Sequence, residues 1–123
     1  MKQYQAAILG FGTVGSGVYR VLTENGKQIT HREGIEIAVK RILVRDFEHE
    51  PNLGLAPRDV FTTSFDDIAA DKDIGIVIEC MGGIEPARTF ILKALGAGKT
   101  VVTSNKEVMS KHWPEFEKAA KAT

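Results

Sequence analysis

Three glycines near the start of the sequence have the spacing of a phosphate-binding turn. Gly10, Gly12 and Gly15 stand between an apolar run, residues 4–9, and a segment with helical spacing, residues 13–24. In a strand–turn–helix unit the first glycine permits a tight turn, the second lets a pyrophosphate approach the backbone, and the third lets the helix pack on the sheet. The unpaired amides at the helix start favour an anion. The spacing predicts a dinucleotide-binding turn; the alternative is a glycine-rich turn without a ligand.

The end of the second predicted strand, residues 36–44, bears on which dinucleotide would bind. An acid there commonly accepts hydrogen bonds from the adenosine ribose, whereas a cation can pair with a 2′-phosphate. Both types are present, because Arg45 and Asp46 follow the strand. Arg45 could pair with the phosphate of NADP, Asp46 could reach a ribose, and both could be a solvated junction between strand and loop. The sequence favours NADP without excluding NAD.

A second segment is expected at the same edge of the sheet, because it also follows a predicted strand. Residues 80–83 come after the buried strand 74–79, and their glycines would let the backbone lie against the nicotinamide side of a dinucleotide. Cys80 is interpreted as a small apolar filler, since the sequence places no histidine beside it. Glu79 could contact either the neighbouring backbone or a ligand.

Lys106 follows a strand predicted over residues 100–103 and falls in the first turn of the next helix. The positive end of the helix dipole disfavours a cation there by about 0.3–1 kcal/mol. We therefore expect an anionic or carbonyl-bearing ligand near Lys106, the alternative being a lysine that reaches into solvent. Ser104 and Glu107 have the spacing of a capping box for this helix.

The predicted elements alternate between strands and helices. A strand over residues 60–63 completes a set of five, and the first helix is expected to stop at Asn25–Gly26. Further helices are predicted over residues 64–70, 87–95, 104–111 and 114–122, the last two separated by Pro114. This alternation predicts an α/β fold: a Rossmann-type doubly wound parallel sheet of about five strands with helices on both faces.

Two further expectations concern packing. Gly17 is interpreted as a packing glycine on the first helix rather than as a ligand contact. Met109, Trp113 and Phe116 recur at helical spacing near the end of the sequence and are predicted to belong to the core.

The composition limits the classes of partner and site. The 123 residues include 16 basic and 16 acidic side chains, and a formal net charge of zero argues against nucleic acid or an anionic membrane as partner. The single cysteine excludes an internal disulfide and a zinc site built from several cysteines, and no metal site is expected. With no membrane-spanning stretch and no signal sequence, we expect one cytoplasmic domain over residues 1–123.

Three segments together resemble a known family. They are ILGFGTVGSGV over residues 8–18, IVIECMGG over residues 76–83 and VVTSNKEVMS over residues 101–110. In this order and spacing they are similar to the amino-terminal NAD(P)-binding domain of homoserine dehydrogenase, and the third segment makes the resemblance specific. Members of that family interconvert L-homoserine and L-aspartate 4-semialdehyde with NAD or NADP, in the aspartate route to threonine and methionine.

The resemblance implies roles for residues near the first glycines. Phe11, Thr13 and Val14 would line the pyrophosphate turn together with the glycines. Arg45 would lie near the adenosine ribose or its 2′-phosphate.

For the nicotinamide half, the resemblance implies contacts from the two later segments. Cys80, Met81 and Gly82 would border it, and Lys106 would contact the nicotinamide ribose region beside the substrate pocket. Cys80 and Met81 stand where relatives often have small hydroxyl residues, and Ser104 stands where they often have alanine.

Family members continue into a second domain, which would supply the substrate-binding acids, the catalytic lysine and aspartate, a monovalent cation site and most of the dimer interface. We therefore expect no catalytic residue in this chain, which resembles an excised domain that binds NADP or NAD without turning over substrate. The small-molecule substrate would bind through the other domain, and the whole enzyme would be a homodimer or homotetramer.

Two other functions fit parts of the pattern. One is a nucleotide-sensing regulatory domain that binds NAD without catalysis; such domains usually carry an acid at the end of the second strand, where this chain has Val44–Arg45. The other is a two-domain dehydrogenase that acts on sugars or other semialdehydes.

Overall fold

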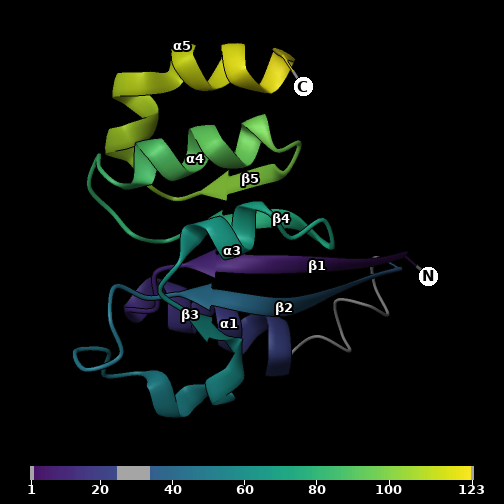
Figure 1. The fold of residues 1–123 in the computed structure, drawn as a ribbon, viewed down its shortest axis with the longest axis vertical. Helices are drawn as coiled ribbons and strands as arrows, with labels where there is room; N and C mark the ends of the chain where they lie inside the picture. The colour runs from purple at the N-terminus through teal and green to yellow at the C-terminus, as the bar shows by residue number, and fades with distance from the viewer. Residues whose placement is uncertain (1, 25–33, 123) are drawn as a thin grey trace.

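The structure is a computed structural model that describes residues 2–24 and 34–122. In this part of the chain, five parallel strands form one sheet in the order β3-β2-β1-β4-β5 (Figure 1). The strands are β1 (Lys2–Leu9), β2 (Ile35–Leu43), β3 (Phe61–Thr62), β4 (Ile74–Glu79) and β5 (Thr100–Thr103). The predicted Rossmann-type sheet is confirmed, and β4 and β5 have the predicted bounds.

The described residues also form four helices and two short 3-10 turns, and the last helix follows the last strand. The helices are α1 (Thr13–Glu24), α3 (Phe65–Ala69), α4 (Ala87–Gly96) and α5 (Lys106–Ala122), and the 3-10 turns are η1 (Leu53–Leu55) and η2 (Arg58–Val60). α1 has the predicted bounds, whereas the stop predicted at Asn25–Gly26 lies outside the described residues.

The carboxyl-terminal residues of β1 and β2 are buried on both faces. Residues 6–9 of β1 have no exposed surface. On one face, Ile8 and Ile42 pack with Val18 and Tyr19 of α1. The other face carries a separate cluster shared by the sheet, α3 and α4, with members Ala7, Leu9, Leu43, Phe65, Ile68, Ile74, Val77 and Ala94. A third cluster of Ile91, Val108 and Phe116 joins α4 to α5, which lie together at the top of Figure 1.

This strand order places a switch point between β1 and β4. β2 and β3 extend the sheet on one side of β1, whereas β4 and β5 extend it on the other. The carboxyl ends of the strands lie at the left of Figure 1, where the arrowheads of β1, β2 and β5 point. In open parallel sheets, ligands bind outside this edge at the switch point.

The start of α5 corrects one prediction. The helix begins at Lys106, and its cap is Asn105, whose Oδ1 accepts a hydrogen bond from the Val108 amide at 3.2 Å. The predicted Ser104–Glu107 capping box is therefore wrong, because Ser104 precedes the cap.

Two other packing predictions also differ from the structure. Trp113 is half exposed, because it lines an open hollow beside α5, whereas Phe116 is buried as predicted. Gly17 is exposed on α1, and a Cβ there would meet no atom within 4 Å, so it is not a packing glycine.

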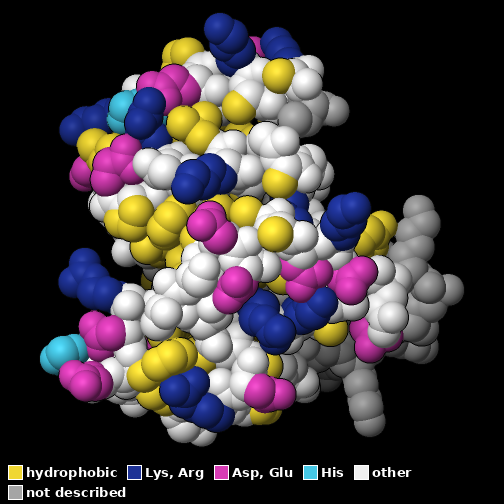
Figure 2. Space-filling model, in the orientation of Figure 1, with side chains coloured by type: hydrophobic (Ala, Val, Ile, Leu, Met, Phe, Trp, Pro, Cys, Tyr) yellow, Lys and Arg dark blue, Asp and Glu magenta, His cyan; other side chains and the backbone are white. Residues whose placement is uncertain are grey.

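The surface carries both charges. Figure 2 shows acidic and basic side chains interspersed over the visible face, with hydrophobic groups between them. No helix in the described residues is both long enough and apolar enough to cross a membrane.

Candidate functional site

A hollow of about 430 Å³ opens at the carboxyl ends of the strands, beside the switch point. We call residues 10–15, after β1, the first turn, and residues 80–83, after β4, the second turn. Both turns line the hollow, and the end of β2 contributes a third wall. Six of the residues predicted for the site meet here: Gly10, Phe11, Gly12, Arg45, Cys80 and Met81.

The glycines of the first turn have different geometric needs. A Cβ on Gly15 would lie only 2.0 Å from the Gly10 carbonyl oxygen, so this position tolerates no side chain while α1 packs as it does. Gly10 has φ +92°, and its Cβ would lie 3.2 Å from the Cys80 carbonyl oxygen. Gly12, in contrast, has no neighbour within 4 Å of its Cβ position. Only Gly12 faces open space where a bulky anion could approach the backbone.

Phe11 anchors the first turn from behind. Its ring is buried and makes edge-to-face contacts with Tyr19 and Phe61, at centroid distances of 5.7 and 5.3 Å. Its carbonyl oxygen accepts a hydrogen bond from Asn52 Nδ2 at 2.9 Å. Phe11 can therefore offer only its backbone to a ligand, and the turn is held from two sides.

The start of α1 leaves amides available. The first intrahelical hydrogen bond runs from the Ser16 amide to the Gly12 carbonyl, at 2.9 Å. The preceding amides have no partner within the helix, and the helix dipole adds positive potential. Thr13 and Val14 are exposed here, on a shallow groove that runs along α1 rather than in the 430 Å³ hollow.

The residues after β2 differ in what they can reach. Arg45 is exposed, lines the hollow and makes no hydrogen bond to any other described residue. Asp46 does not line the hollow, and its Oδ1 accepts hydrogen bonds from the His49 amide at 2.7 Å and the His49 ring at 2.8 Å. The His49 amide is the main reason that the pKa of Asp46 is lowered. Of the two, Arg45 is placed to meet a ligand.

The second turn is held by a carboxylate. Glu79, the last residue of β4, is fully buried, and its Oε2 accepts hydrogen bonds from the Met81 amide at 2.7 Å and the Gly82 amide at 3.3 Å. Its Oε1 accepts a hydrogen bond from the Thr103 hydroxyl of β5. Of the two roles open to Glu79 in the sequence, the structure shows the contact with neighbouring backbone.

Cys80 behaves as an apolar filler. It packs against the cluster on the α1 face of the sheet, and burial, with a smaller effect from the charge of Glu79, raises the pKa of its thiol to about 11. A thiol with this pKa is almost entirely protonated at neutral pH and is a poor nucleophile.

Lys106 and Gly82 lie outside the hollow's lining. Lys106 is exposed on the first turn of α5, and Gly82 is exposed with φ +77°. They are linked through Asn105, which caps α5 and donates a hydrogen bond from Nδ2 to the Gly83 carbonyl at 2.5 Å.

Comparisons with known proteins identify the family. The family model described as "Homoserine dehydrogenase, NAD binding domain" matches residues 10–123. The chain belongs to this family. It is 36% identical over 121 residues to the homoserine dehydrogenase of Bacillus subtilis, covering 98% of this chain and 28% of that protein. The family assignment fits the glycine turn and strand order described above.

Solved structures agree with this assignment. The crystal structure of a homoserine dehydrogenase from Thiobacillus denitrificans has a TM-score of 0.89 and 42% identity, over 99% of this chain and 28% of that one. A hyperthermophilic archaeal homoserine dehydrogenase in complex with NADPH has a TM-score of 0.72 and 29% identity, over 98% of this chain and 41% of that one. The chain thus spans about a quarter to two-fifths of the length of these relatives.

Several residues around the site were not predicted from the sequence. The hollow is also lined by Leu43, Val44, Glu50, Thr63, Pro86 and Phe90. Asn52, Thr103 and Asn105 support the turns from outside it. Thr103 and Asn105 could have been indicated only by their positions, at the end of a predicted strand and just after it. No sequence pattern points to Asn52.

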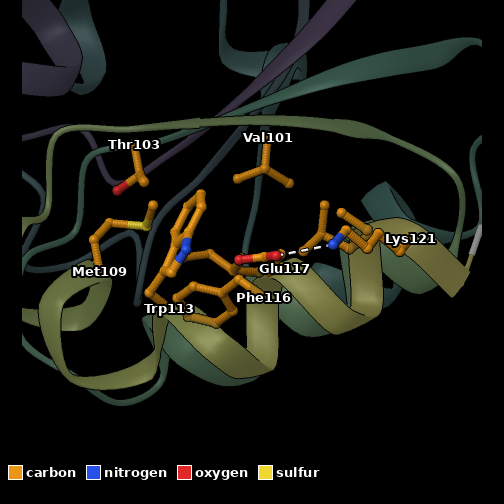
Figure 3. A pocket seen from close by; sticks show the side chains of 10 residues that line it. Val101, Thr103, Met109, Trp113, Phe116, Glu117 and Lys121 are labelled. Atoms are coloured by element: carbon orange, nitrogen blue, oxygen red, sulfur yellow. Dashed lines mark hydrogen bonds and ion pairs between the residues drawn. The ribbon is translucent and has the colours of Figure 1, made fainter.

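A second hollow, of about 300 Å³, lies between β5 and α5 (Figure 3). Met109, Trp113 and Phe116 of α5 face Val101 across it, and its charged members Glu117 and Lys121 pair with each other at 2.9 Å. It contains none of the residues predicted for the site and no group suited to chemistry.

Proposed function

We propose that this chain binds NADP or NAD across the carboxyl edge of its sheet. Gly12, which has open space where a Cβ would be, would let the pyrophosphate approach the backbone, and the free amides at the start of α1 would donate hydrogen bonds to it. This cradle is the observation that carries the proposal. Phe11, Thr13 and Val14 would contribute backbone only, with Gly10 and Gly15 giving the turn its shape.

The remaining residues would meet the two ends of the dinucleotide. Arg45 would pair with the 2′-phosphate of NADP, which makes NADP the preferred cofactor. Cys80, Met81 and Gly82 would border the nicotinamide half. Lys106 would lie near the nicotinamide ribose and the substrate, where its positive charge would favour an anionic or carbonyl group.

The whole protein's activity is part of the same proposal. The chain spans 28% of the Bacillus subtilis relative, so it would be the cofactor-binding part of an enzyme that interconverts L-homoserine and L-aspartate 4-semialdehyde. The bound cofactor would supply hydride transfer, while a further domain would supply the catalytic residues and bind the substrate. The single-domain boundary, a homodimeric or homotetrameric assembly and a cytoplasmic location belong to this proposal too.

A titration of the chain with NADPH and NADH, followed by calorimetry, tests the binding. We expect Gly12→Val to lower affinity for both cofactors by at least tenfold, because its side chain would fill the space proposed for the pyrophosphate. The matched control is Gly17→Val. It also adds a side chain in open space, but on α1, less than two helical turns beyond Gly12. It should bind both cofactors as the parent chain does.

Two results would contradict the proposal. Failure of the parent chain to bind either cofactor would remove the function, and full affinity in Gly12→Val would make the first turn purely structural. Oxidation of homoserine by this chain alone would contradict the assignment of catalysis to another domain.

A further inference from the structure

Glu79 is an unusual residue for the end of a central strand. It is the only fully buried carboxylate among the described residues, and it stands between Leu9 of β1 and Thr103 of β5 in the sheet register. Burying a carboxylate is unfavourable unless hydrogen bonds replace its water. An apolar residue would complete the strand with no such requirement, so the hydrogen bonds of Glu79 indicate what the carboxylate does here.

The hydrogen bonds of Glu79 run in one direction. The Met81 and Gly82 amides donate to one carboxylate oxygen, and the Thr103 hydroxyl donates to the other. The Thr103 oxygen in turn accepts a hydrogen bond from the Asn105 amide at 3.0 Å. Every bond to Glu79 is therefore donated to it, which is the pattern that an ionised carboxylate satisfies fully.

The same network reaches both segments proposed to meet the nicotinamide half. Through Glu79 it fixes the amides of the second turn, where Gly82 and Gly83 have φ +77° and +71°. Through Asn105, whose side chain binds the Gly83 carbonyl and caps α5, it fixes the first residue of that helix. The second turn and the start of α5 are thus held as one unit.

We propose that Glu79, with Thr103 and Asn105, is a positioning network for the nicotinamide half of the cofactor. The inference rests on the proposed function. It means that the nicotinamide half of the cofactor is positioned by residues other than those of the first turn. Glu79 touches no ligand in this role; it acts through the backbone of Met81 and Gly82 and through the start of α5. Its loss should disturb the nicotinamide end of the site and leave the adenosine end intact.

The test compares a whole dinucleotide with its adenosine fragment. Calorimetry measures binding of NADPH and of 2′,5′-ADP to the parent chain, Glu79→Gln, Thr103→Val and Thr103→Ser. Glutamine keeps the shape of Glu79, but its NH₂ group is itself a donor. It would face one of the groups that donate to Glu79, either the amides of the second turn or the Thr103 hydroxyl. Valine removes the hydroxyl that ties the second turn to β5, whereas serine keeps it. If the parent prefers NADH, the pair becomes NADH and ADP.

A matched structural control lies at the other end of the same strands. Lys99, which directly precedes β5, is also buried. Its Nζ donates hydrogen bonds to the Asp71 and Ile74 carbonyls, just before and at the start of β4, at 2.7 and 2.6 Å. Lys99→Met removes a comparable tether at the amino edge of the sheet, far from the hollow.

We expect Glu79→Gln and Thr103→Val to lower the affinity for NADPH by about tenfold and to change the affinity for 2′,5′-ADP by less than twofold. Thr103→Ser should bind both ligands as the parent chain does. Lys99→Met should change the affinities for NADPH and 2′,5′-ADP by the same factor, or not at all. Equal loss of both ligands, or loss of neither, would overturn the inference. Should Glu79→Gln not fold, the Thr103 pair decides alone. A parent chain that binds neither ligand would instead reject the proposed function.

Discussion

The two turns at the carboxyl edge of the sheet are built on opposite principles. The first turn, residues 10–15, owes its form to the absence of side chains: Gly15 leaves room for the Gly10 carbonyl, and Gly12 leaves the backbone open. The second turn, residues 80–83, owes its form to a side chain, the buried carboxylate of Glu79. The open space of the first turn comes from glycines within six residues, whereas the second turn is tied through Glu79 to Thr103, more than twenty residues away.

The difference suits the two halves of a dinucleotide. A pyrophosphate needs amides and open space, which a short glycine-rich segment supplies by itself. The nicotinamide end must be aligned with a substrate, so its supports need to be joined to one another. The two turns also touch, because Gly10 packs directly on the backbone of Cys80 and Met81.

The largest expected effect comes from breaking the first turn at Gly15. Its Cβ would lie 2.0 Å from the Gly10 carbonyl oxygen, so Gly15→Ala must push α1 away from the sheet. We expect the free energy of unfolding to fall by about 3 kcal/mol or more, as for severe overpacking. Chemical denaturation measures this loss.

Gly12→Ala is the control for this prediction, because a Cβ at Gly12 meets nothing within 4 Å. Its unfolding free energy should stay within about 1 kcal/mol of the parent value. A Gly15→Ala chain as stable as Gly12→Ala would show that the contact between helix and turn is loose.

A smaller effect is expected at the adenosine end. Arg45→Met removes the exposed guanidinium on the hollow. It should lower the affinities for NADPH and 2′,5′-ADP by about tenfold, or about 1.4 kcal/mol, and leave the affinity for NADH nearly unchanged. This pattern is the converse of the one expected for Glu79→Gln, which spares the adenosine fragment. Together the two variants assign each end of the hollow to one half of the ligand.

The control is Arg20→Met, which removes an exposed arginine whose ion pair, within the described residues, is with the exposed Glu24 on α1. It should leave all three affinities unchanged. Equal loss of NADH and NADPH in Arg45→Met would mean that Arg45 does not read the 2′-phosphate.

The same contrast explains what could be predicted from the sequence. The fold and the first turn depend on local patterns: β-branched runs, helical spacing and glycine positions, so β4, β5 and α1 were predicted with their observed bounds. The role of Glu79 could not be decided from the sequence, because Thr103 of β5 becomes its neighbour only in the folded sheet, and the amides of Met81 and Gly82 face it only in the folded second turn.

Errors arose where a tertiary contact overrides a local pattern. Ser104 and Glu107 fit a capping box, yet Asn105 caps α5 because its side chain also binds Gly83 across the strand ends. Trp113 has core spacing, yet it lines an open hollow beside α5 and is half exposed. Asn52, which supports the first turn, lies in a loop with no periodic pattern at all.

The smallest expected effect is also specific to the second turn, and it concerns the Cys80 thiol. Burial is the main cause that raises its pKa to about 11, and the charge of Glu79 is the second. Glu79→Gln removes only the second cause. Alkylation of Cys80 between pH 8 and 9.5 should therefore become faster by less than tenfold, because the thiolate is the reacting form. The rate of iodoacetamide labelling, followed by mass spectrometry, measures this change.

The pH dependence of stability supplies an independent check on the same thiol. Because folding raises the pKa of Cys80 from 9.0 to about 11, its contribution to stability is fully present below about pH 9 and is lost as the pH rises toward 11. Glu79→Gln should lessen that alkaline loss, and Cys80→Ala should abolish it. If labelling in Glu79→Gln were no faster than in the parent chain, Glu79 would not contribute to the raised pKa of the Cys80 thiol, and burial alone would account for it.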